Sequence, residues 1–120
     1  MIPMKMITIS PAQQPQFLMN LNGQIEKHLS DNNLTINRIT RLVGMSRTDL
    51  HRKLGKTVGM SASEYIRFVR LHKAAELLIN EPEWSIYQIS LEVGFINQSY
   101  FTRRFHELFG VCPVIFREQN

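Results

Sequence analysis

Cysteine is almost missing from this chain, with Cys112 the single one among 120 residues. No disulfide can form within the chain, and a zinc site would need more thiolates. The chain has four histidines, His28, His51, His72 and His106, and none has a partner at a close metal-ligand spacing. We therefore expect no metal and no cofactor. Long apolar runs are missing too, since none approaches the roughly 18 residues that cross a bilayer.

The first residues lack the long apolar stretch and small-residue cleavage site of a secretory signal. We therefore expect a cytoplasmic protein with no membrane partner. Paired carboxylates, a nucleophile with its base and a phosphate-cradling loop are also missing. We expect neither an enzyme nor a small-molecule site in this segment.

Charge is unevenly distributed. Lysine and arginine number 14 against 10 acids, a net charge of +4. Residues 34–55 hold five bases against Asp49 alone, whereas residues 81–92 hold three glutamates and no base. This asymmetry is typical of a protein that meets a polyanion on one side.

Apolar residues recur at three- and four-residue steps along most of the chain, which predicts an all-α fold of about seven helices. Residues 1–16, rich in proline and polar residues, are expected to be a linker or loose arm. We expect a first helix-turn-helix subdomain over 17–60, a long linker helix over 61–80 and a second subdomain over 81–120. The first helix is expected to run from Phe17 to about Ser30. Side chains that can cap helices precede the later ones, at Thr35, Ser46, Ser61 or Ser63, Ser85 and Asn97; Asp49 would complete a near capping box with Ser46.

The sequence repeats itself. Ile36, Ile39, Val43 and Gly44 recur 50 residues later as Ile86, Ile89, Val93 and Gly94. Leu50, Leu54, Val58 and Gly59 recur 51 residues later as Phe101, Phe105, Phe109 and Gly110. Each copy has the pattern of two helices around a glycine turn, the helix-turn-helix motif.

The second helix of such a unit can lie in the major groove of DNA. The side chains that point away from the apolar face would then read bases; they are Arg47, Thr48, His51 and Arg52 in the first unit and Gln98, Ser99, Thr102 and Arg103 in the second. For any one of them, a merely solvated polar residue is an equally good interpretation. Their repetition on equivalent faces favours DNA.

The second copy follows a long signature, Ile86-x-x-Ile-x-x-x-Val-Gly-Phe-x-Asn-Gln-Ser-Tyr-Phe-x-Arg-x-Phe-x-x-x-Phe-Gly-x-x-Pro113. With Ser46-Arg-x-x-Leu-x-Arg-Lys-Leu and Gly59-Met-Ser-x-Ser-Glu-Tyr-Ile66, it resembles the DNA-binding domain of the AraC/XylS family of bacterial transcription regulators. The resemblance runs from about Leu18 to Arg117. Ala62, Ile96 and Cys112 depart from the residues usual in the family.

The resemblance implies base contacts from Thr48, His51 and Arg52 and from the four residues named on the second unit. It also implies phosphate contacts at the helix N-termini near Thr35 and Ser85. The full set of expected phosphate-contacting residues is Thr35, Arg38, Lys53, Ser85, Asn97 and Arg104.

The function expected from these features is sequence-specific binding of promoter DNA by a transcription regulator. The family implies an activator that contacts RNA polymerase. The alternative is a degenerate helical module that binds the polymerase or another regulator without reading DNA. The linker-like start favours the C-terminal part of a larger sensor or two-component regulator over a small stand-alone protein.

Overall fold

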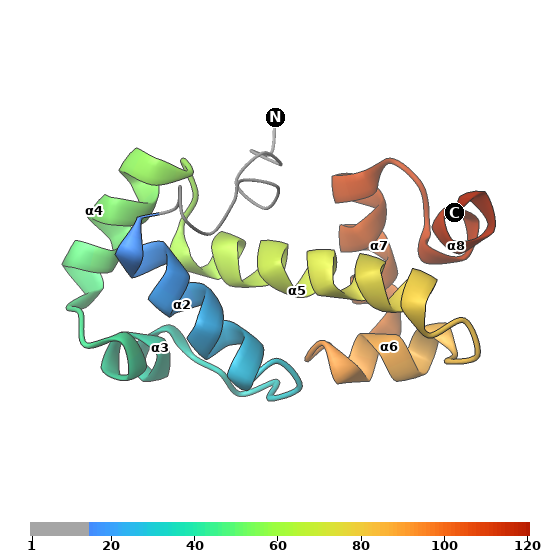
Figure 1. The fold of residues 1–120 in the computed structure, drawn as a ribbon, viewed down its shortest axis with the longest axis horizontal. Coiled ribbons are helices and arrows are strands. Elements are labelled where there is room, and N and C mark those ends of the chain that lie inside the picture. The colour runs from blue at the N-terminus through green and yellow to red at the C-terminus, as the bar shows by residue number, and fades with distance from the viewer. Residues whose placement is uncertain (1–14) are drawn as a thin grey trace. The chain divides into compact units, whose positions relative to one another are not determined.

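The computed structural model describes residues 15–120, and every regular element within them is a helix (Figure 1). The predicted all-α fold with about seven helices is confirmed. The helices are α2 (Gln16–Lys27), α3 (Ile36–Val43), α4 (Arg47–Thr57), α5 (Ala62–Asn80), α6 (Ile86–Glu92), α7 (Gln98–Phe109) and α8 (Pro113–Gln119). The arm expected over residues 1–16 lies outside the described residues, apart from its last two positions.

The predicted caps are in place. The side-chain oxygens of Thr35, Ser46 and Asn97 accept the backbone N–H three residues on. Ser85 does the same and forms a full reciprocal capping box with Gln88. The long helix α5 is opened by Ser61, whose hydroxyl accepts from the N–H of Glu64 while the Glu64 carboxylate accepts from the Ser61 N–H.

Two details of the predicted helices are wrong. The sequence predicts that the first helix continues to about Ser30. It ends at Lys27, and His28 is already outside the helix. The capping box expected at Ser46 is only half formed. The backbone N–H of Asp49 donates to the Ser46 hydroxyl, but the Asp49 carboxylate instead pairs with Arg52.

The described residues divide into two compact units. The first contains the residues up to His28 together with Asn33–Arg67, and the second contains Leu29–Asn32 together with Phe68–Asn120. Helix α5 contributes its first part to one unit and its remainder to the other.

The first unit buries the apolar faces of α2, α3 and α4 against the start of α5. Its most deeply buried side chains are Leu18, Leu21, Ile25, Ile39, Leu50, Leu54 and Tyr65. The Tyr65 hydroxyl donates a hydrogen bond to the side-chain oxygen of Asn22. Burial of the Tyr65 ring raises the pKa of its hydroxyl to about 12.

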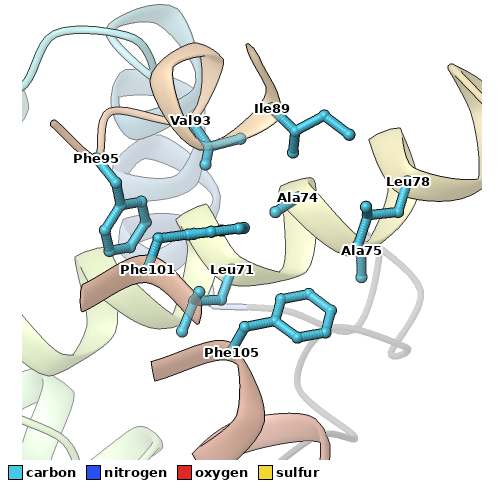
Figure 2. Close-up of a cluster of buried hydrophobic side chains, with 9 residues drawn as sticks. All are labelled: Leu71, Ala74, Ala75, Leu78, Ile89, Val93, Phe95, Phe101 and Phe105. Atoms are coloured by element: carbon cyan, nitrogen blue, oxygen red, sulfur yellow. The ribbon is translucent and has the colours of Figure 1, made fainter. Parts of the chain in front are cut away.

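The second unit is built around aromatic rings (Figure 2). Its buried cluster comprises Leu71, Ala74, Ala75 and Leu78 of α5, Ile89 of α6, Val93 and Phe95 that follow it, and Phe101 and Phe105 of α7. The Phe105 ring lies 4.5 Å from that of Phe109 and 5.4 Å from that of Phe116, centre to centre. These ring contacts pack α8 against α7 by apolar burial.

The sequence repeat has its counterpart in local structure. The hydroxyls of Thr40 and Ser90, 50 positions apart, each donate a hydrogen bond of 2.8 Å to the carbonyl oxygen three residues earlier. Both side chains are buried. The glycines that follow, Gly44 and Gly94, have φ of 69° and 90°, a left-handed conformation that glycine adopts without steric strain.

Arg70 of α5 is buried, with 7% of its surface exposed. Its guanidinium donates to the carbonyl oxygens of Val93, Gly94 and Asp31, at 3.3, 2.8 and 2.7 Å. All four residues belong to the second unit. Burial lowers the pKa of Arg70. Its hydrogen bonds join the turn between α6 and α7 to the segment 29–32.

Most of the apolar residues of α5 are buried, but Ile79 is 47% exposed. It lies in the last turn of the helix, after the last position that is packed into the second unit. No helix within residues 15–120 combines the length and apolar character that a membrane span requires.

Candidate nucleic-acid interface

Helix α4 presents one polar face because its other face is buried. Leu50 and Leu54 are 1% and 0% exposed, which fixes the rotation of the helix in the first unit. The four side chains predicted to read bases from this helix are all exposed; they are Arg47, Thr48, His51 and Arg52. Leu50 and Leu54 lie four residues apart on the buried side of α4. The side chains on the opposite side are therefore the ones that can contact a ligand.

Both arginines of this face are held by side-chain partners. Arg47 donates to the side-chain oxygen of Asn37 on α3, at 3.1 Å. Arg52 pairs with Asp49 one turn earlier, with 2.8 Å between Nη2 and Oδ1. Its hydrogen bond lowers the pKa of the Asp49 carboxyl below its usual value. Like any ordinary aspartate, Asp49 is ionised at neutral pH, so it carries a negative charge beside Arg52.

Helix α7 carries the second predicted reading face, and here the surface is hollowed. An open hollow is lined by Gln98, Ser99, Thr102 and Arg103, the four residues predicted from the sequence, and also by His106, Glu107 and Cys112. Three of the predicted residues are exposed and Thr102 is half-buried. The structure thus brings the whole predicted set of this helix together on one concave surface.

Two arginines of α7 flank the half-buried ring of Tyr100. The guanidinium carbons of Arg103 and Arg104 lie 5.5 and 5.1 Å from its centre. Arg104 also donates to Glu107 at 3.1 Å, and a hydrogen bond with Tyr100 raises the pKa of Arg104. Arg103 is exposed and lines the hollow, whereas Arg104 is half-buried and already paired. Of the two, Arg103 is the better placed to meet a ligand.

Three residues predicted to contact phosphates are helix caps. Thr35, Ser85 and Asn97 are exposed, and each uses a side-chain oxygen to accept a backbone N–H. Capping occupies an acceptor, so the hydroxyl hydrogens of Thr35 and Ser85 and the amide hydrogens of Asn97 remain able to donate. An anion can accept from these groups without disturbing the caps.

The two remaining basic residues of the predicted phosphate-contacting set differ in exposure. Lys53 is exposed on α4, with its ammonium nitrogen 5.5 Å from the centre of the Phe17 ring. Arg38 is half-buried on α3. Lys53 therefore keeps its charge at the surface, and Arg38 presents only part of its side chain.

The sequence interpretation missed several partners of the predicted residues. His106, which reads from the sequence as an ordinary solvated residue, lines the hollow on α7 together with Glu107. Asp49 and Glu107 were not recognised as partners of Arg52 and Arg104. Both pairs have a spacing of three residues on a helix, a signal that could have identified them. Ile96, noted as unusual beside the second reading helix, is 70% exposed.

The chain is similar to known transcription regulators. The family described as a helix-turn-helix domain matches residues 39–119. The probable transcription factor PqrA of Proteus vulgaris is 37% identical over 87 residues, which cover 72% of this chain and 70% of PqrA. The transcriptional activator VirF of Yersinia enterocolitica is 32% identical over 93 residues, 75% of this chain and 34% of VirF.

A solved structure shares the fold. A transcriptional regulator from Chromobacterium violaceum, described as having an AraC-type DNA-binding domain, superposes with a TM-score of 0.78 at 29% identity, covering 86% of this chain and 90% of that one. The chain spans about a third or less of the length of several other curated relatives that it matches.

Three observations agree on the family: the match over most of the chain, the two-unit helical fold, and the exposed faces of α4 and α7. This chain belongs to the AraC/XylS family of transcription regulators and is a DNA-binding domain of that family.

Proposed function

We propose that this domain recognises a specific promoter sequence by placing α4 and α7 in two adjacent major grooves. The observation that carries the proposal is the hollow on α7, which gathers Gln98, Ser99, Thr102 and Arg103 on one surface. The equivalent helix of the first unit offers Arg47, Thr48, His51 and Arg52, all exposed. Polar side chains that only contact solvent have no reason to gather on the corresponding helix of both units. Their presence on both α4 and α7 therefore favours a shared role in binding.

The side chains suit base recognition. Arginine can donate two hydrogen bonds to O6 and N7 of guanine, and glutamine can pair with N6 and N7 of adenine. We assign these roles to Arg52, Arg103 and Gln98. Thr48 and Thr102 can contact a thymine methyl group, and His51 and Ser99 can donate to or accept from base edges.

Phosphate contacts would fix the position of each unit on the duplex. We assign them to the exposed caps and basic residues, which are Thr35, Ser85, Asn97, Arg38, Lys53 and Arg104. The ends of α3 and α6 that Thr35 and Ser85 cap have free backbone N–H groups and a positive dipole, which favour an anion. Arg104 would have to exchange Glu107 for a phosphate.

Helix α5 contributes residues to both units, and its length can be compared with the repeat of the major groove. Helix α5 has 19 residues and is therefore about 28 Å long. Successive major-groove faces on one side of B-DNA lie about 34 Å apart. If α5 holds the two units closer together than straight B-DNA allows, the DNA must bend or one of the two helices must insert imperfectly.

We further propose that the protein to which this domain belongs is a cytoplasmic activator that contacts RNA polymerase. VirF is named a transcriptional activator, and its similarity to this chain supports that direction of regulation. The chain would serve as the DNA-binding part of a longer regulator.

Selection of bound duplexes from a random DNA pool tests the proposal directly. We expect one preferred site, bound with an affinity that falls steeply with salt as several counterions are released. Arg52→Ala and Arg103→Ala should each weaken binding to the selected site. Lys73→Ala, a loss of one positive charge on α5, is the matched control and should have a smaller effect.

A degenerate interaction module would give the opposite result. It would select no sequence, and its binding to a partner protein would be insensitive to Arg52→Ala and Arg103→Ala. That outcome would reject the assignment of α4 and α7 to DNA.

A further inference from the structure

Helix α4 carries one acidic residue among its bases, and this acid is paired with an arginine expected to read DNA. Asp49 and Arg52 are joined at 2.8 Å, and their side chains are 52% and 56% exposed. An ion pair this exposed contributes little to folding stability. A role in ligand recognition explains its place on this face better than a role in the fold.

The pair restricts where Arg52 can point. The backbone N–H of Asp49 is tied to the Ser46 cap at 3.1 Å, so the carboxylate starts from a fixed position in the first turn of α4. The carboxylate engages Nη2 of Arg52, and the guanidinium retains enough N–H donors for a bidentate contact with guanine. A free arginine would lose more side-chain entropy on binding than one that is already held.

The negative charge also opposes the wrong mode of binding. An unpaired arginine at the surface attracts any phosphate, whatever the sequence. A carboxylate beside it repels phosphates and so disfavours binding in which Arg52 contacts the backbone. Specificity is a difference between affinities, and a local repulsive group can raise it.

The other two arginines expected to read bases are held differently. Arg47 has the neutral side chain of Asn37 as its partner, and Arg103 lies against the Tyr100 ring. Among these three arginines, Arg52 is the one that the described structure pairs with a carboxylate.

We propose that Asp49 is a specificity-determining residue, which positions Arg52 for one base pair and penalises contact of Arg52 with the DNA backbone. The inference rests on the proposed DNA-reading role of α4. Asp49 acts through Arg52 and is therefore a positioning residue.

Binding of the wild-type protein and three single variants to the selected duplex and to a scrambled duplex tests this role. Asp49→Asn keeps the size of the side chain and removes its charge, and Asp49→Ala removes both. Glu76→Gln is the matched control. It neutralises the acid of another ion pair between residues three positions apart on a helix, that of Glu76 with Lys73 on α5 at 3.4 Å. The measured quantity is the ratio of the dissociation constants for the scrambled and selected duplexes.

We expect both Asp49 variants to bind the scrambled duplex more tightly and to lower the ratio by about five-fold, near the lower end of what a bidentate base contact contributes. The loss should concentrate at one base pair when the selected site is substituted position by position. In an Arg52→Ala background, Asp49→Asn should change the ratio no further.

A ratio that stays within about two-fold of wild type in Asp49→Asn, or that falls equally in Glu76→Gln, would overturn the inference while leaving the proposed function intact. The inference also fails if Asp49→Asn lowers the ratio in the Arg52→Ala background. A wild-type protein that prefers no duplex would remove the proposed function, and this inference with it.

Discussion

Arg70 of α5 donates a hydrogen bond of 2.8 Å to the carbonyl oxygen of Gly94, in the turn that joins α6 to α7. A Cβ atom at Gly94 would fall on the Arg70 guanidinium and close to the carbonyl oxygen of Leu29. The corresponding position of the first unit, Gly44, has open space around it. The two glycines thus share a backbone conformation but differ in what surrounds them.

Gly44→Ala and Gly94→Ala should therefore differ in cost. Both force an alanine into the left-handed region, which destabilises by about 1–2 kcal/mol. Gly94→Ala must also displace Arg70, so we expect a clearly larger loss of unfolding free energy in the second unit. Chemical denaturation followed by circular dichroism, which reports the helices of both units, measures the loss in each variant. Equal effects of the two variants would show that Arg70 does not constrain the turn.

Phe105→Ala should destabilise the second unit by about 3–5 kcal/mol, because the ring is fully buried among Phe101, Phe109 and Phe116. Tyr87→Ala, an exposed aromatic on α6, is the control and should change the unfolding free energy by no more than about 0.5 kcal/mol. Thermal unfolding monitored by circular dichroism distinguishes them. An undisturbed transition in Phe105→Ala would contradict its place in the core.

Acid should weaken the second unit through His72. The ring packs at 4.5 Å from Phe68 and 5.2 Å from Phe109, and burial lowers the pKa of His72 below its usual 6.5, with Glu76 acting in the opposite direction. The unfolded chain then binds the proton more readily than the folded protein. The stability from this group is complete above pH 6.5 and is lost as the pH falls through that value toward the lower folded pKa.

The measurement is the unfolding free energy of the second unit at several pH values between 5 and 8, an interval of about 1.5 units on either side of the usual histidine pKa. The decline below pH 6.5 should be shallower in His72→Gln, which cannot titrate there. If the variant and the wild-type protein show parallel curves, another group is responsible.

Arg103→Ala should weaken binding to the selected duplex by about 1–3 kcal/mol and relax the preference at one base pair. Lys53→Ala should weaken binding to all duplexes alike and reduce the salt dependence by about one counterion, because we assign it to a phosphate. Fluorescence anisotropy with substituted duplexes separates the two effects. An unchanged base preference in Arg103→Ala would remove its assigned role.

The local structure of this protein was largely predictable from its sequence. Helix spacing, the capping residues Thr35, Ser85 and Asn97, and the turn glycines Gly44 and Gly94 act over three or four positions, so they can be seen without knowing the fold. The repeat also indicated the exposed polar faces of α4 and α7, because an apolar stripe on one side of a helix leaves the polar side to the solvent. Where two local options competed, as for the Asp49 carboxylate between Ser46 and Arg52, the choice was predicted wrongly.

Contacts between distant segments were decided only by the tertiary structure. Arg70 reads as one more surface base in a basic chain, yet it is buried and donates to a carbonyl 39 positions away. Arg117 likewise donates to the carbonyl oxygens of Leu78 and Glu81 at the end of α5. The hollow that places Cys112 beside the polar side chains of α7 is another such contact. Periodicity encodes which side of a helix is apolar, whereas the partner of a buried polar group depends on which segments pack together, and no local pattern contains that information.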